Sequence, residues 1–237
     1  MLDWDSEFFG VGVARISEPV LSVEKLTDVL FELKNKSVRL VYWASKCELD
    51  NGQVEGLCGR LVDIKTTFAV DLRCLDSNDF IRTDIVEVYS SWMPVSELEN
   101  LAIQSGEHSR FAMDPCLPRE KFVSLYKIWT NRSLQKEIAR ESLVIREAHR
   151  VVGMVTLAEK NGRGDIGLLA VDPGCRRKHY GEILVRAAQR WFIKNGYELA
   201  QVVTQGKNIA ACNLYKKCNY SIENIEYFYH FWLSSDP

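Results

Sequence analysis

The segment LLAVDPGCRRKHYGEILVRAA, residues 168–188, contains three elements in a row. An apolar run ends at Val171, a basic turn follows, and apolar residues then recur at helical spacing from Tyr180 onward. The segment therefore predicts a strand, a turn and an amphipathic helix. The positive side chains precede the helix, where the helix dipole disfavours them. Cations that flank backbone N–H groups at a helix start form a phosphate site, so this turn is a candidate anion-binding loop.

The residues on either side of this segment predict an alternation of strands and helices. From residue 84 onward we expect a strand at 84–91, helices at 96–109 and 118–134, strands at 142–148, 150–159 and 164–173, a helix at 180–196, a strand at 197–205, a helix at 208–219 and a strand at 226–233. The three central strands are joined by short turns and should form an antiparallel meander. Ser96 and Glu99 have the spacing of a capping box, and Gly196 is a C-terminal stop.

Residues 1–83 predict a smaller α/β domain that precedes a larger domain at 84–237. Its expected elements are a strand at 13–16, a helix at 22–34 with Ser22 as its N-cap, a strand at 39–45, a short helix at 51–61, a long strand at 61–72 and a loop at 74–80. The fold class is therefore α/β (or α+β), with a mixed sheet and helices on both faces.

Composition and charge exclude several classes of protein. The net charge of −2 over 237 residues and the pI near 6.1 argue against a nucleic-acid or membrane-surface partner. Seven cysteines without a C-x-x-C pair suggest neither a disulfide framework nor a metal site. The first ten residues are acidic and aromatic, unlike a signal peptide, and no apolar run reaches the roughly 18 residues of a membrane span. We therefore expect a cytoplasmic protein with reduced thiols.

The sequence over roughly residues 84–233 resembles the GCN5-related N-acetyltransferase (GNAT) superfamily in three features. They are the order of elements, the segment 168–188, and the run NIAACNLYKKCNY at 208–220. The resemblance implies a mixed, mostly antiparallel central sheet flanked by helices. It also implies transfer of an acetyl group from the cosubstrate acetyl-CoA to a primary amine on a small molecule.

The basic turn is similar to the pyrophosphate loop of this superfamily, which reads R/Q-x-x-G-x-G/A. The resemblance implies coenzyme binding by Arg176, Arg177, Lys178, His179, Tyr180, Gly181 and Glu182. Gly181 matches the pattern, but His179 stands where glycine is usual. Either its backbone then adopts a negative φ angle or the loop is locally reshaped. The alternative for the whole turn is a solvated loop before a helix.

Further site residues follow from the same resemblance. Main-chain groups of Leu169, Ala170 and Val171 are expected to bind the pantetheine amides, although an ordinary core strand would have the same sequence. Asn208 is expected to contact the coenzyme. Tyr215 takes the position of a general acid that donates to the departing thiolate, unless it is a packed helix side chain.

Two other positions bear on the site. Asn219 stands at a usual glycine position, where asparagine tolerates left-handed backbone geometry. No general base is assigned, because His149 and Glu159 near strand ends are better explained as solvated residues.

The acceptor is suggested by the N-terminal run LDWDSEFFG, residues 2–10. It resembles the opening of the TDP-fucosamine acetyltransferase group, which implies a nucleotide-linked deoxyamino sugar. Trp4, Phe8 and Phe9 could form a sugar platform or an N-terminal hydrophobic plug. Another amine (an aminoglycoside, a polyamine or a protein N-terminus) and a non-catalytic acyl-CoA-binding module stay open. The aromatic strand at 226–233 should be buried in the sheet or in a homodimer.

Overall fold

The computed structural model describes residues 1–76 and 83–233, and the chain forms two compact units. The first unit holds Met1–Lys65, Ser109–Leu117 and the residues from Ile225; the second holds Thr66–His108 and Pro118–Asn224. Strands β3 (Gly59–Asp71) and β9 (Ser221–Trp232) each contribute residues to both units. The division does not coincide with a boundary after residue 83, because the chain returns twice to the first unit. A contiguous domain at 1–83 stays a prediction. The loop predicted at 74–80 lies partly outside the described residues.

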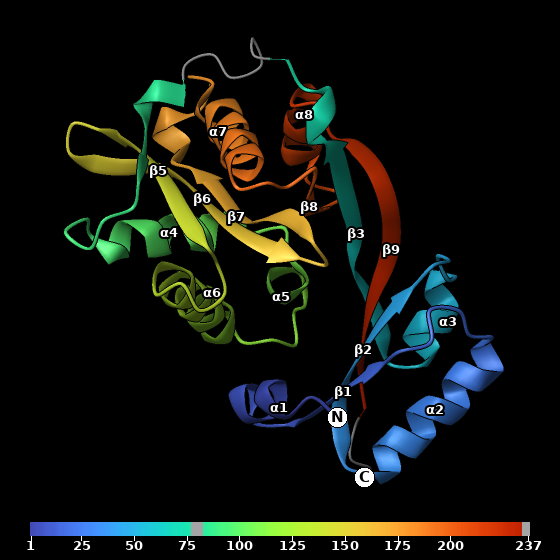
Figure 1. Ribbon diagram of the computed structural model, residues 1–237. Coiled ribbons are helices and arrows are strands. Elements are labelled where there is room, and N and C mark those ends of the chain that lie inside the picture. Colours follow the sequence, from blue (N-terminus) through green and yellow to red (C-terminus); the bar gives the residue numbers. More distant parts are fainter. Residues whose placement is uncertain (77–82, 234–237) are drawn as a thin grey trace. The chain divides into compact units, whose positions relative to one another are not determined.

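The strands of the first unit pair in both parallel and antiparallel directions. Its remaining elements are α1 (Asp3–Phe9), β1 (Gly12–Ile16), α2 (Val23–Asn35), β2 (Val38–Ser45), α3 (Asn51–Gly56) and α5 (Arg110–Met113) (Figure 1). Strand β2 pairs in parallel with β1 and antiparallel with β9. Trp43, Tyr229 and Phe231 are fully buried in the core of this unit. The final aromatic strand is thus buried within its own chain.

Helix α1 was not predicted from the sequence. Its aromatic side chains pack on one another: the rings of Trp4 and Phe8 are stacked 5.1 Å apart, and Phe9 stacks on Phe111 at 6.1 Å. These contacts lie within the first unit, but Trp4 stays 45% exposed and α1 has no buried residue, so the plug and the sugar platform both stay open. The predicted N-cap of α2 is confirmed, because the Ser22 hydroxyl accepts from the Lys25 N–H.

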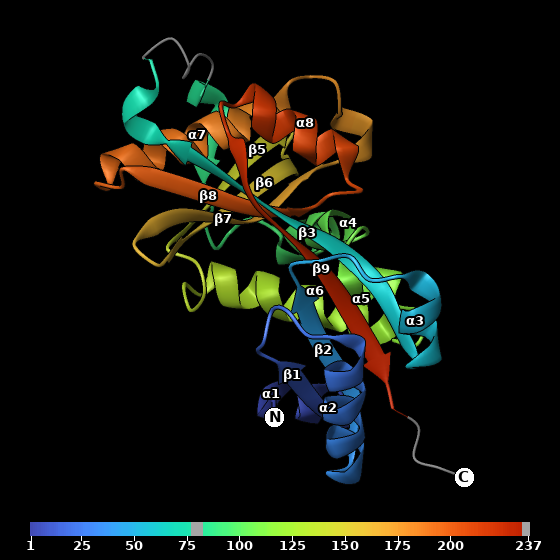
Figure 2. The same ribbon diagram turned by 90° about the vertical axis from the view of Figure 1, so that its right-hand side faces the viewer.

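The second unit has the predicted order of elements, with additional short turns. Its described elements are η1 (Leu72–Cys74), η3 (Thr83–Ile85), β4 (Val86–Val88), α4 (Val95–Ser105), α6 (Arg119–Leu134), β5 (Glu141–Glu147), β6 (Arg150–Lys160), β7 (Arg163–Val171), η4 (Pro173–Cys175), α7 (Tyr180–Lys194), β8 (Leu199–Gln205) and α8 (Ile209–Lys217). Strands β4 to β7 pair antiparallel in sequence order, which confirms the meander, and β7 pairs in parallel with β8. Helices α4 and α6 cover one face of this sheet and α7 the other (Figure 2).

Two predicted helix signals had different outcomes. The capping box at Ser96 is wrong, because α4 begins after Pro94 without a side-chain cap. Glu99 instead accepts a 2.8 Å hydrogen bond from Asn131 of α6, so a contact between helices replaces the local one. The C-terminal stop of α7 is confirmed, since Gly196 has a φ angle of 83°.

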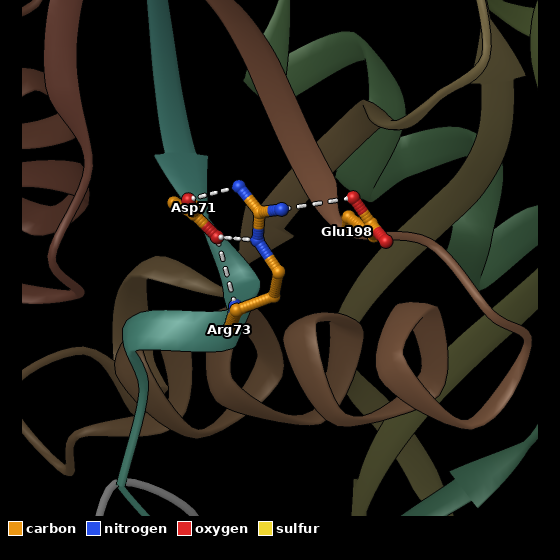
Figure 3. A network of polar contacts seen from close by, with 3 residues as sticks. All are labelled: Asp71, Arg73 and Glu198. Atoms are coloured by element: carbon orange, nitrogen blue, oxygen red, sulfur yellow. Dashed lines mark hydrogen bonds and ion pairs between the residues drawn. The ribbon is translucent and has the colours of Figure 1, made fainter.

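An exposed polar network holds the end of β3 against the start of β8 (Figure 3). Arg73 donates to both carboxylate oxygens of Asp71, at 2.9 and 2.7 Å, and to Glu198 at 3.1 Å. The Leu72 N–H also donates to the Glu198 carbonyl oxygen at 2.8 Å. Exposed ion pairs contribute little stability, so the network mainly sets geometry. No helix in the described parts of the chain has the length and apolar character that crossing a membrane requires.

Candidate active site

A cavity of about 490 Å³ lies within the second unit. Its walls come from the loop before α7 and the first turn of α7, the strands β7 and β8, helix α8, the end of α4 and the middle of α6. The predicted site residues that line it are Leu169, Ala170, Val171, Arg176, Arg177, His179, Tyr180, Gly181, Glu182, Asn208 and Tyr215. Lys178 does not line the cavity, because its ammonium group binds the Glu147 carboxylate at 2.8 Å.

The sheet opens between β7 and β8 at this cavity. Their recorded pairs run from Gly164 opposite Ala200 to Ile166 opposite Val202, and both strands continue beyond that point. The continuing stretches, residues 167–171 and 203–205, line the cavity. This opening leaves one edge of β7 available to a ligand that can pair with main-chain groups.

The loop before α7 has a left-handed backbone at two positions that are not glycine. Arg177 has a φ angle of 63°, and His179, the N-cap of α7, has a φ angle of 64°. Of the two alternatives for His179, a negative φ angle is wrong, because histidine here adopts the geometry that glycine favours. Histidine is among the residues enriched in this region of φ/ψ space. Asn219 has a φ angle of 70°, as its tolerance of this geometry predicts.

The first turn of α7 retains free N–H donors. His179 makes no side-chain cap hydrogen bond, so the N–H groups of Tyr180, Gly181 and Glu182 have no partner within the helix. Arg176 and Arg177 also line the cavity. The combination of unpaired N–H groups and guanidinium groups is suited to a diphosphate.

The carboxylate of Glu182 is already paired. It lies 2.7 Å from the Lys217 ammonium and 3.2 Å from His179 Nδ1. Partial burial raises the pKa of Glu182, but the hydrogen bonds from Lys217 and His179 outweigh it and lower the pKa below its usual value. The group is therefore an anion that neutralises its neighbours.

Tyr215 is buried in α8 but lines the cavity, with 4% of its surface exposed. Burial raises its pKa well above the usual value, with Cys218 and Cys212 as minor causes. The phenol is therefore protonated at neutral pH, as a proton donor must be. Asn208 caps α8: its side-chain oxygen accepts from the Ala211 N–H at 3.2 Å.

Sequence reasoning missed the wall of the cavity that α4, α6 and the segment after α4 form. This wall contains Gln104 and Ser105 of α4, His108 after it, and Tyr126 of α6. The side-chain oxygen of Gln104 is buried and accepts no hydrogen bond from the described residues. Periodicity predicts both helices but not which of their residues reach a cavity, so the sequence carries no signal for this wall. His149 and Glu159 do not line the cavity.

Comparisons with known proteins agree with this geometry. Residues 108–220, which include most of the cavity wall, match the model of the Acetyltransferase (GNAT) family. The spore coat polysaccharide biosynthesis protein SpsD of Bacillus subtilis (strain 168) is 26% identical over 132 residues. That match covers 56% of this chain and 45% of SpsD, so the chain spans less than half the length of this relative.

Solved structures share the fold at low sequence identity. A functionally unknown conserved protein from Staphylococcus epidermidis ATCC 12228 superimposes with a TM-score of 0.68 at 14% identity, over 92% of this chain and 83% of that one. A GCN5-related N-acetyltransferase from Sphaerobacter thermophilus gives 0.58 at 12% identity, over 90% and 68%. The chain thus shares the fold of a GCN5-related N-acetyltransferase, and its residues 108–220 are similar to the GNAT family.

Proposed function

We propose that this protein is an N-acetyltransferase that moves an acetyl group from acetyl-CoA to the amino group of a nucleotide-linked deoxyamino sugar. The observation that carries the proposal is the single cavity that joins the α7 loop, the open edge of β7 and Tyr215. These three parts supply an anion site, a main-chain pairing edge and a proton donor. An acyl-CoA needs all three along one path.

The residues present fit acetyl-CoA. The N–H groups of Tyr180, Gly181 and Glu182, together with Arg176 and Arg177, would hold the diphosphate. The main chain of residues 169–171 would pair with the pantetheine amides, because the β8 pairing ends before them. Gly181 allows the first turn of α7 to lie close to α8, since a Cβ there would lie 3.1 Å from Leu214 Cδ2.

In the proposed reaction one residue of this chain, Tyr215, transfers a proton. Acetyl-CoA supplies a thioester: the amine nitrogen bonds to its carbonyl carbon, the carbon–sulfur bond breaks, and the amine loses a proton to water. Tyr215 would donate its phenol proton to the departing sulfur and regain a proton from solvent. Its raised pKa keeps that proton in place until it is needed.

The carboxylates of the cavity argue against a polycationic acceptor. Glu182 is the one carboxylate among the lining residues described, and the cations Arg176 and Arg177 are assigned to the coenzyme diphosphate. Because Glu182 is already paired with Lys217, no counter-charge is left for several ammonium groups. Aminoglycosides and polyamines carry such groups, whereas a nucleotide-linked sugar brings negative phosphates.

A sugar acceptor has three further supports. The relative SpsD takes its name from polysaccharide biosynthesis, and the N-terminal run resembles acetyltransferases of a TDP-linked amino sugar. Gln104 offers a buried oxygen that could accept a hydrogen bond from a sugar hydroxyl or from the reacting amine.

A thiol-release assay over a panel of acceptors tests the proposal. The panel contains a TDP-linked deoxyamino sugar, an aminoglycoside, spermidine and a peptide with a free α-amine. We expect kcat/KM for the TDP-linked sugar to exceed the others by at least about tenfold, which corresponds to about 1.4 kcal/mol. A preference for spermidine or the aminoglycoside would contradict the acceptor class. Heat from acetyl-CoA binding in calorimetry without thiol release for any amine would instead support a binding module.

A further inference from the structure

Three side chains of the loop before α7 converge on one carboxylate. Glu147, the last residue of β5, accepts from Lys178 Nζ at 2.8 and 2.9 Å and from the Tyr180 hydroxyl. The Cys175 thiol lies 3.6 Å from the same carboxylate. The side chains come from positions before, within and after the left-handed stretch of the loop. The carboxylate therefore holds the loop on both sides of its unusual backbone.

This backbone needs support because its residues have side chains. Arg177 and His179 both have left-handed φ angles, which L-residues with a Cβ adopt at an energetic cost. Such conformations persist where surrounding contacts over-determine them. Lys178 lies between the two strained positions, and Tyr180 follows directly after the second. The contacts of Glu147 are thus placed where they can maintain both angles.

We propose that Glu147 is a positioning residue for acetyl-CoA: its carboxylate holds the loop in a conformation that glycine would adopt unaided. The inference rests on the proposed function, because it concerns the same coenzyme site. In this role Lys178 acts through Glu147 and not as a phosphate ligand. Its position outside the cavity supports that assignment.

A positioning role and a simple charge effect of Glu147 predict opposite changes in coenzyme affinity when its carboxylate is neutralised. A carboxylate beside a phosphate site repels the ligand, so a mere charge effect predicts that its neutralisation tightens binding. Removal of Glu147 would also release Lys178, a cation, towards the phosphates. A positioning role predicts weaker binding instead, because the N–H groups of the first turn would no longer converge.

Calorimetry with acetyl-CoA on the full chain distinguishes the two effects. For Glu147→Gln we expect Kd to rise about tenfold and KM for acetyl-CoA to rise with it, while kcat stays within about twofold. The matched control is Glu159→Gln, which removes another strand-end carboxylate whose partner, Arg140, lies 3.4 Å away. We expect the control to keep the Kd of the unmodified protein.

A rescue experiment separates positioning from general destabilisation. His179→Gly removes the side chain that makes one left-handed angle costly, so Glu147→Gln should lose much less affinity in that background. An equal loss in both backgrounds, or unchanged or tighter binding by Glu147→Gln alone, would overturn the positioning role. If the unmodified protein bound no acetyl-CoA, the proposed function would fail first, and this role with it.

Discussion

The ring of Tyr215 packs against the ring of Phe68, with 5.8 Å between centroids and an angle of 47° between the planes. The contact fixes the Tyr215 ring of α8 against β3 within the second unit. Phenylalanine at position 215 would keep this packing and remove the hydroxyl alone. The site therefore permits a clean test of the proton donor.

Tyr215→Phe should lower kcat by on the order of 100-fold, because the thiolate would leave without a proton. Acetyl-CoA affinity should stay unchanged, which calorimetry checks beside the rate measurement. Tyr220→Phe is the matched control, since Tyr220 is equally buried and lies 6.0 Å from Tyr215 but does not line the cavity. Full activity of Tyr215→Phe would show that another group protonates the sulfur.

Gly181→Val should weaken acetyl-CoA binding by about tenfold or more. A Cβ at this position would lie 3.1 Å from Leu214 Cδ2, so a branched side chain must push α7 and α8 apart or project into the cavity. Gly56→Ala is the control, because a Cβ there meets nothing within 4 Å. Equal affinities of the Gly181 variant and the unmodified protein would argue against coenzyme contact at the first turn of α7.

Thr156→Val should destabilise the second unit by about 1–3 kcal/mol. The register of β6 and β7 shifts between Val155 and Leu157, and there the Thr156 hydroxyl oxygen accepts from the Leu168 N–H at 2.8 Å. Valine has nearly the same shape but leaves that N–H unpaired. Denaturant unfolding of Thr156→Val and Thr156→Ser checks this, since serine keeps the acceptor. A loss as large for serine as for valine would assign the effect to packing instead.

The stability of the first unit should fall as the pH drops from about 6.5 towards 4. Burial lowers the pKa of His230 to about 4, and the charge of Arg110 contributes to the shift. Arg110 must donate in its 3.0 Å contact with His230 Nε2, so Nδ1 carries the proton and donates to Asp114 at 2.6 Å. In the folded state the His230 side chain is thus neutral, whereas in the unfolded state it takes up a proton below pH 6.5.

The loss from this histidine alone is on the order of 3 kcal/mol once the pH reaches 4. Unfolding free energies from pH 7.5 to 4 check the slope, and His230→Gln should flatten it. If the slope in this range were unchanged in the variant, the carboxylates would carry the pH dependence and His230 would not.

Local signals in the sequence were sufficient for the strand, loop and helix around residues 168–188. Alternating and helical spacing there agree with the fold, so each element forms where its own residues favour it. The geometry of His179 was beyond such signals. Its left-handed angle coincides with contacts from Glu147, which is 32 positions away in the chain, and no local rule includes that carboxylate.

The capping box is a case in which a local signal predicted a contact that the structure does not contain. Ser96 and Glu99 have the right spacing, but the Asn131 amide on another helix binds Glu99, and tertiary contacts override a local motif worth about 1 kcal/mol. Gln104 was equally beyond prediction. Helical periodicity does not show which buried polar atom is left without a partner.

The place of β9 in the first unit has a consequence for the newly made protein. Tyr229, Phe231 and Leu233 complete a core that otherwise consists of residues from the first quarter of the sequence. While the ribosome is still translating residues 108–220, β2 lacks its antiparallel neighbour and exposes a long apolar edge. The core of the first unit is therefore incomplete until residues 225–233 have been made. Nascent molecules that stall before residue 225 should be prone to aggregate or to recruit chaperones.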